Sequence, residues 1–165
     1  MNISKNLRKK IFSKEVIISL TIIILVFVLD RVSKISIINN QSTNSSLFIN
    51  DYLNLELVWN TGIGFGLLSH SANIYYHLIS FLIFLVIFFL IYLINKASFF
   101  EKILYSLILG GALGNFFDRI FYFAVPDFID FHINDFHWFT FNIADIFITL
   151  GVLILITNDL ILNKK

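Results

Sequence analysis

Apolar residues are concentrated in four stretches of the chain, and we expect each stretch to form a membrane-spanning helix. The expected spans are residues 16–38, 74–94, 103–125 and 143–162. The second has 21 residues and no formal charge, and about 20 apolar residues are needed to cross the hydrocarbon core of a bilayer. Because lipid offers the backbone no hydrogen-bond partners, these spans should be helical.

The connection between the first two spans changes character along its length. It begins with polar, turn-forming residues, after which Leu53, Leu55, Leu57 and Trp59 occupy every second position. A period of two is typical of a strand or hairpin, here one that lies on the membrane face. No internal repeat is visible. We therefore expect a single membrane-embedded domain over residues 1–165, an all-α polytopic protein with four transmembrane helices and a small β element between helices 1 and 2.

The composition agrees with a membrane protein. Apolar residues make up 58% of the 165 positions and charged residues 14%, whereas about a quarter of the residues of a soluble domain are charged. This argues against a soluble globular protein and excludes a disordered or collagen-like chain. The absence of cysteine excludes disulfides, thiolate nucleophiles and sulfur-ligated metal centres.

Lys and Arg are distributed unevenly between the connections. Nine of the twelve precede the first span, link the second to the third or follow the fourth. The connections 39–73 and 126–142 contain none and carry acidic residues instead. Because cytoplasmic segments are enriched in Lys and Arg, we expect both termini in the cytoplasm and the β element on the extracytoplasmic side. The basic start resembles a signal peptide, but no small-residue cleavage motif follows it.

Four acids occur inside the expected spans, where an ionisable residue is usually partnered and functional. One of them, Asp159, lies near the cytoplasmic end of the fourth span, and we expect it to face headgroups or water. Counted from the cytoplasmic ends, Asp30, Asp118 and Asp145 all lie about 21 to 26 Å into the membrane. Three more polar residues lie within a turn of that level: Asn115, Arg119 and Asn142. Asp127 follows the third span, and Pro126 places it outside the helix, since the residue before proline avoids helical backbone angles.

A structural interpretation of these acids stays open. Asp30 or Asp118 alone could form a buried ion pair with a nearby cation, for which the candidates are Arg31, Lys34 and Arg119. Asp127 alone would be typical of a solvated loop acid. The case for a functional site therefore depends on the convergence of acids from several helices.

The connection 126–142 contains further candidate ligands. Asp130 and Asp135 have no other support, and we expect them to be solvated. Together with His132 and His137 they could bind a metal, but the five-residue histidine spacing matches no strong ligand signature. We therefore expect no metal site.

Other function classes have weaker support. Ser33 and Lys34 could suggest a serine–lysine hydrolase, but adjacent residues on a helix do not face each other. No phosphate-binding loop, dinucleotide fingerprint or metalloprotease motif is present, and nothing favours nucleic-acid binding. A proton-coupled transporter would hold its acids near the midplane, whereas these acids cluster toward one face. A structural membrane protein would use them only to hold helices together.

Two glycine-rich segments mark places of close approach. Gly62, Gly64 and Gly66 form a run that is typical of a turn or of backbone beside a ligand. The segment 110–114 has the small-xxx-small spacing that is typical of closely packed helices.

Five sequence blocks resemble, in order and spacing, those of the lipoprotein signal peptidase family, also called signal peptidase II. The blocks are DRVSK at 30–34, NTGIGFG at 60–66, GGALGNFFDR at 110–119, VPDFI at 125–129 and FNIAD at 141–145. Together they cover nearly the whole chain. Two positions depart from the family pattern: Gly64 stands where alanine is usual, and Pro126 where a second valine is common.

The resemblance implies an aspartyl endopeptidase of the bacterial inner membrane. Such an enzyme removes the signal peptide from diacylglyceryl-modified prolipoproteins, cutting just before the lipidated cysteine. It implies membrane lipid as surroundings, no nucleic acid, and neither a metal nor an organic cofactor. The sequence does not determine the oligomeric state, and a monomer is our working expectation.

Block matching also implies roles for individual residues. Asp127 and Asp145 correspond to the catalytic pair. The supporting residues of the site are Asp30, Asn60, Gly62, Asn115, Asp118, Arg119 and Asn142. As a hypothesis, Asn115 and Asn142 orient the carboxylates or the substrate, and Arg119 pairs with Asp118. The glycine run and the β element would form a flap over the substrate.

Overall fold

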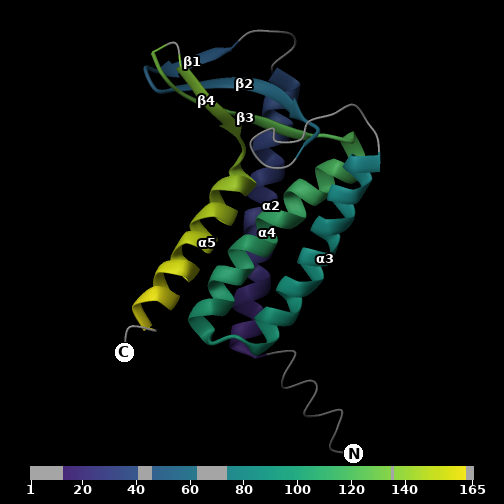
Figure 1. Ribbon diagram of the computed structural model, residues 1–165, viewed down its shortest axis with the longest axis vertical. Coiled ribbons are helices and arrows are strands. Elements are labelled where there is room, and N and C mark those ends of the chain that lie inside the picture. The colour runs from purple at the N-terminus through teal and green to yellow at the C-terminus, as the bar shows by residue number, and fades with distance from the viewer. Residues whose placement is uncertain (1–12, 41–45, 63–73, 135, 163–165) are drawn as a thin grey trace, which may run out of the picture.

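The computed structural model describes residues 13–40, 46–62, 74–134 and 136–162 (Figure 1). The described residues form four long helices and one four-stranded antiparallel sheet. The helices are α2 (Lys14–Asn40), α3 (Ile74–Lys96), α4 (Phe99–Tyr122) and α5 (Ile143–Leu162). The strands are β1 (Leu47–Asn50), β2 (Leu53–Asn60), β3 (Val125–Ile133) and β4 (Phe136–Phe141).

Helix α4 lies at the centre of the bundle and packs against α2, α3 and α5. Glycines allow this approach. A Cβ atom on Gly110 would lie 2.8 Å from the Cβ of Val26, and one on Gly111 would lie 2.7 Å from the carbonyl oxygen of Ala144. The expected close packing of the 110–114 segment is therefore confirmed. A buried apolar cluster joins α3 to α4: Ile87, Leu90, Ile108, Leu109 and Ala112.

The outer faces of the bundle are apolar. Large side chains such as Ile24 and Phe81 are 60% and 57% exposed, which suits contact with lipid better than contact with water. Among the described residues, three helical segments are long and apolar enough to cross a membrane: Lys14–Asn40, Tyr76–Lys96 and Ile143–Ile161. α4 is similar in length but carries buried polar residues, including Asp118 and Arg119.

The protein is mostly helical with a small antiparallel sheet, and this sheet is larger than the expected β element. The hairpin of β1 and β2 occurs where the alternating pattern predicted a β element. The second connection adds β3 and β4, which we did not predict, and the strand order is β1-β2-β3-β4. Val125 to Phe128 are all buried, so this part of β3 is not a half-buried strand, the kind for which polar and apolar residues alternate.

The helix bounds differ most from expectation in the third span. α4 begins after Ser98, which forms a capping box with Glu101, and it ends at Tyr122. Phe123 then adopts left-handed backbone angles with φ of 55°, and Val125 already belongs to β3. The expected range 103–125 is therefore shifted toward the C-terminus, whereas the expected range 143–162 coincides with α5.

Candidate active site

A charge-balanced group of side chains lies where α2 meets α4. The ammonium of Lys34 donates to Oδ2 of Asp30 at 2.8 Å and to Oδ2 of Asp118 at 2.7 Å. The guanidinium of Arg31 donates to Oδ1 of Asp118. All four side chains are buried, and their two negative charges face two positive charges. The ion-pair interpretation of Asp30 and Asp118 is therefore confirmed, with Lys34 and Arg31 as the partners.

A second group contains two carboxylates that are held by amides. Asp127 in β3 accepts from Nδ2 of Asn60 at 2.8 Å and from Nδ2 of Asn142 at 2.6 Å. Asp145, in the first turn of α5, accepts from Nδ2 of Asn115 at 2.9 Å and from the backbone N–H of Asn142 at 3.2 Å. In the described part of the chain, neither acid forms an ion pair.

The environment of Asp127 favours its protonated form. Its side chain is buried, with 2% of the residue exposed. Burial raises the pKa of Asp127 to about 6, and the nearby charge of Asp145 acts in the same direction, against the hydrogen bonds from Asn60 and Asn142. Two neighbouring carboxylates resist carrying two negative charges at once. Such a pair can share one proton at a pH where isolated carboxyls are ionised.

Asn115 connects the two groups of acids. Its Oδ1 accepts from the Lys34 ammonium at 2.8 Å, while its Nδ2 donates to Asp145. Asp30 adds a second connection, because its Oδ1 accepts from the backbone N–H of Ala144 at 3.0 Å. Acids from α2, α4 and α5 therefore converge at one level, as the counted depths predicted.

A further chain of hydrogen bonds leads from Asp127 through Asn60 and Gly62 to Arg119 on α4. Oδ1 of Asn60 accepts from the backbone N–H of Gly62 at 2.9 Å, and the carbonyl of Gly62 accepts from Nη2 of Arg119 at 2.5 Å. Hydrogen bonds thus join, directly or through Lys34, all nine residues that the sequence singled out: Asp30, Asn60, Gly62, Asn115, Asp118, Arg119, Asp127, Asn142 and Asp145.

The expected pairing of Arg119 with Asp118 is wrong. Successive helical residues project about 100° apart, so Asp118 faces α2 while Arg119 reaches Gly62. The Tyr76 hydroxyl donates to the carbonyl of Arg119 at 2.5 Å, a contact that the sequence did not indicate. Gly64 and Gly66 of the expected flap lie outside the described residues, so the flap stays a prediction.

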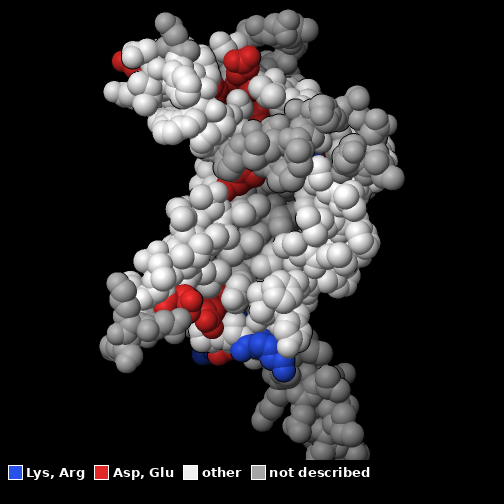
Figure 2. Space-filling model, viewed as in Figure 1, with Lys and Arg blue, Asp and Glu red and all other residues white. Residues whose placement is uncertain are grey.

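A cavity of about 330 Å³ opens beside the carboxylates. Six polar residues line one part of it: Asn60, Asn115, Arg119, Asp127, Asn142 and Asp145. The other lining residues are almost all apolar and come mainly from α3, α4 and α5, among them Leu82, Ile108 and Ile148. Figure 2 shows this hollowed face between α3 and α5, with acidic atoms at the end nearest the sheet.

Two further expectations concern residues near this site. Asp130, which we expected to be solvated, is only 3% exposed, because β2 and β4 pair with β3 on either side of it. Asp135 lies outside the described residues. Ser33 donates to the backbone carbonyl of Asp30 while Lys34 binds other residues, which is consistent with our argument against a serine–lysine pair.

The fold and these contacts define a helical membrane protein. Two carboxylates that accept hydrogen bonds from amide groups lie beside its largely apolar cavity. The sequence profile of signal peptidase (SPase) II matches residues 22–161, and the chain therefore belongs to the signal peptidase II family. The resemblance noted from the sequence blocks is confirmed.

Relatives and solved structures agree with this family. The lipoprotein signal peptidase of Pelagibacter ubique (strain HTCC1062) is 46% identical over 158 residues, covering 94% of this chain and 95% of the relative. That of Francisella tularensis subsp. mediasiatica (strain FSC147) is 49% identical over 127 residues, covering 73% and 77%. A bacterial membrane enzyme solved by the in meso method at 2.3 Å resolution is similar with a TM-score of 0.75 and 32% identity, covering 86% of this chain and 87% of that one.

Proposed function

We propose that this chain is an intramembrane aspartyl endopeptidase that removes the signal peptide from diacylglyceryl-modified prolipoproteins, cutting just before the lipidated cysteine. The observation that carries this proposal is the pair of Asp127 and Asp145 beside the cavity, linked through Asn142, which donates to both. Membership of the signal peptidase II family and the names of the relatives, lipoprotein signal peptidases, support the substrate class.

The chemistry that this pair can perform is hydrolysis by an activated water. The ionised carboxylate takes a proton from water as the water oxygen attacks the scissile carbonyl carbon. The protonated carboxyl donates to the carbonyl oxygen and stabilises the tetrahedral intermediate. As the C–N bond breaks, a proton passes from the pair to the leaving nitrogen, and the pair again holds one proton. The raised pKa of Asp127 supports such a shared proton.

The surrounding amides hold the carboxylates in place for this reaction. Asn60 and Asn142 each donate to a different oxygen of Asp127, which fixes the plane of that carboxylate. Asn115 does the same for one oxygen of Asp145 while it is itself held by Lys34. We assign these three amides, together with Asp30, Gly62, Asp118 and Arg119, to positioning and support of the site.

The cavity suggests how the substrate lies. Leu82, Val86 and Leu90 recur every four residues and line the cavity from one face of α3. An apolar signal helix placed along this face would present its cleavage site to the polar end, where Asp127 and Asp145 lie. The lipid on the cysteine would then remain at the level of the membrane surface, so the substrate would not have to leave the bilayer.

The proposed setting is the bacterial inner membrane, crossed by all four helices. α4 counts as a span because its ionisable residues near the sheet are bonded within the protein, as expected for charges at membrane depth. Lys and Arg at the helix ends lie at the end of the bundle that is away from the sheet. Most of the basic atoms visible in Figure 2 are at that end. By the positive-inside rule, both termini are cytoplasmic and the site faces outward. We propose a monomer surrounded by lipid.

Cleavage of a defined precursor by the purified full-length chain in detergent tests this proposal. The substrate is a diacylglyceryl-modified prolipoprotein, and mass spectrometry locates the cut. We expect cleavage immediately before the modified cysteine and little or none of the same precursor without the lipid. Asp127→Asn and Asp145→Asn should be folded and inactive. Failure of the parent to cut, or a cut elsewhere, would contradict the proposal.

A further inference from the structure

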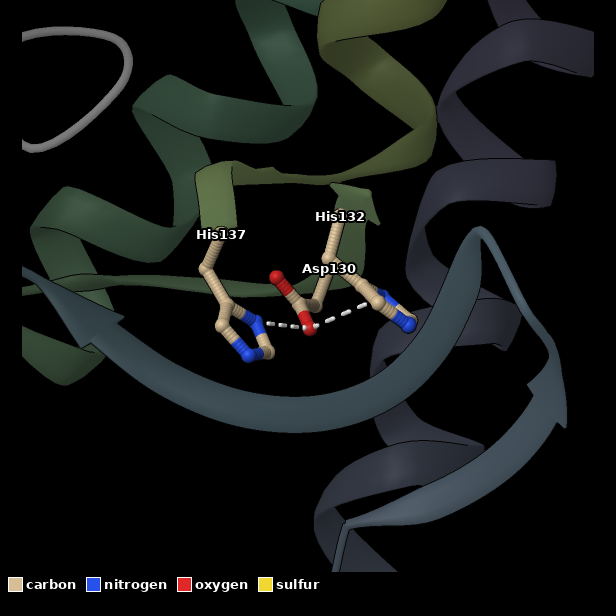
Figure 3. A group of neighbouring side chains, drawn as sticks. All are labelled: Asp130, His132 and His137. Carbon is tan, nitrogen blue, oxygen red and sulfur yellow. Dashed lines mark hydrogen bonds and ion pairs between the residues drawn. The ribbon is translucent and has the colours of Figure 1, made fainter. Parts of the chain in front are cut away.

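The β3–β4 hairpin brings an acid and two histidines together, separately from the Asp127–Asp145 pair. His132 and His137 are partners across the hairpin, and Asp130 precedes His132 by two positions on β3. Figure 3 shows both imidazole rings directed at one carboxylate oxygen. Nδ1 of His137 lies 2.7 Å from Oδ2 of Asp130, and Nδ1 of His132 lies 3.6 Å from the same oxygen.

These distances suit a metal ion with three protein ligands. One ligand atom from each residue lies within 4.8 Å of the other two. Around a tetrahedral zinc ion with bonds of about 2.0 to 2.1 Å, ligand atoms are about 3.3 Å apart. The two nitrogen–oxygen distances lie on either side of that value. The His137 side chain is 56% exposed, so its ring has room to adjust these spacings.

Two of the three residues are buried and the third is exposed, so an ion could reach the site from one side. Asp130 and His132 are 3% and 8% exposed, so the carboxylate supplies a negative charge in a place where an ion would be partly shielded from water. Nδ2 of Asn54 lies 3.4 Å from Nδ1 of His132 and 3.4 Å from Oδ2 of Asp130. An amide nitrogen can only donate. Nδ1 of His132 is therefore the unprotonated acceptor in this contact, and a metal ion bound at Nδ1 would take the place of the Asn54 hydrogen bond.

We propose that Asp130, His132 and His137 bind one divalent metal ion, for which zinc is the test ion. Water would occupy the fourth coordination position. Two imidazoles and one carboxylate are a ligand set that zinc accepts with an open coordination position. This proposal replaces our expectation from the sequence that the chain has no metal site. It does not depend on the proposed peptidase activity, because none of the three residues takes part in the hydrolysis described above.

The position of the ion suggests what it would do. β3 carries Asp127, and β4 leads directly into Asn142 and Asp145. An ion held by both strands would cross-link the hairpin that supports these residues. Because the metal binds the folded arrangement in preference to the unfolded chain, it would stabilise the fold by mass action.

Zinc titration of the full chain tests the proposal. The protein is purified in detergent without a polyhistidine tag, stripped with a chelator and titrated with zinc chloride by calorimetry. We expect one ion per chain. At a free zinc concentration about 100 times Kd, the apparent unfolding temperature should rise by about 5 °C or more. Cobalt(II) in place of zinc should give the visible absorption bands of a four-coordinate site.

Three variants and a control locate the bound ion. Asp130→Asn, His132→Ala and His137→Ala should each weaken zinc binding by about 100-fold or more, since each removes a ligand. His137 is exposed, so its variant is expected to fold like the parent. His77→Ala removes another exposed histidine, on α3, and should bind as the parent does. Absence of stoichiometric binding, or parent-like binding by His137→Ala, would overturn the proposal. So would binding that is lost only in Asp127→Asn or Asp145→Asn.

Discussion

The two groups of acids at the sheet end of the bundle differ in what compensates their charge. Asp30 and Asp118 contact the cations Lys34 and Arg31, whereas Asp127 and Asp145 accept hydrogen bonds from neutral amides. A neighbouring cation compensates the negative charge of a buried carboxylate directly, because the two charges stabilise each other. A carboxylate held by amides stays oriented but can still exchange a proton. The first group therefore suits a structural role and the second suits acid–base chemistry.

The structural group also explains a close helix contact. A Cβ atom at position 114 would collide with Oδ2 of Asp30, so Gly114 lets α2 approach α4 closely enough for Lys34 to reach Asp118. The approach in turn positions Asn115, which donates to Asp145. The ion pairs thus hold Asn115 in position beside Asp145, without contacting the carboxylates of Asp127 and Asp145 themselves.

The largest effect on stability is expected at Lys34. Lys34→Met keeps an unbranched apolar stem but leaves Asp30 without its cation and Asp118 with only Arg31. An uncompensated buried carboxylate should lower the free energy of unfolding by about 3 to 5 kcal/mol, measured by denaturation in detergent. The matched control is Lys96→Met, on an exposed lysine at the end of α3. A loss below about 1 kcal/mol at Lys34 would contradict a structural role for this group.

A smaller and pH-dependent effect is expected at Asp127. Its pKa of about 6 in the folded protein exceeds that of an unfolded aspartate, about 4. Between these pH values the folded chain binds more protons, so the free energy of unfolding of the parent falls as pH rises from 4 to 6. Asp127→Asn has no carboxyl at this position, so its free energy of unfolding should not fall in this way. The free energy of unfolding of the variant minus that of the parent should therefore be about 1 to 3 kcal/mol larger at pH 7 than at pH 4.

Unfolding measured at both pH values checks this prediction. Only the change in the difference between parent and variant is used, because groups far from Asp127 titrate equally in both proteins. Asp145 is coupled to Asp127, so this change reports the titration of the pair. A difference that is the same at pH 4 and pH 7 would mean that the amides hold Asp127 in its charged form as firmly as cations would.

The smallest effect is expected for the ion pair at the opposite end of the bundle. Lys102 donates to Glu15 at 2.6 Å, and the side chain of Glu15 is 48% exposed. Glu15→Gln should change the free energy of unfolding by less than about 1 kcal/mol, because solvent and salt screen exposed pairs. An effect as large as that of Lys34→Met would show that burial does not distinguish these ion pairs.

Much of this arrangement could be predicted from local sequence patterns. Helix periodicity and depth counting placed Asp30, Asp118 and Asp145 at one level, and Pro126 correctly placed Asp127 outside α4. Lys34 was also among the three candidate cations for Asp30, and the four-residue spacing places the two side chains on one helix face. These features depend on residues that are close in sequence.

The features that were missed depend on pairing between distant segments. The burial of Asp130 follows from the register in which it faces Asn54 on β2 and Thr140 on β4, and no local pattern specifies that register. A register shift between Phe131 and His132 then brings His132 opposite His137, although their spacing along the chain matches no metal signature. The partner of Arg119 was also missed, because Gly62 reaches it only through the path of β2 across the sheet.

The central claim is that Asp127 and Asp145 act as one unit in peptide hydrolysis. The most direct test is kcat for the parent, Asp127→Asn, Asp145→Asn and the double variant, with folding of each checked by its unfolding transition. We expect each single variant to lose about 10³-fold or more and the double variant to be little worse than either, as for residues that act together. Folded single variants that cut at the parental rate would contradict the claim. So would losses that multiply in the double variant.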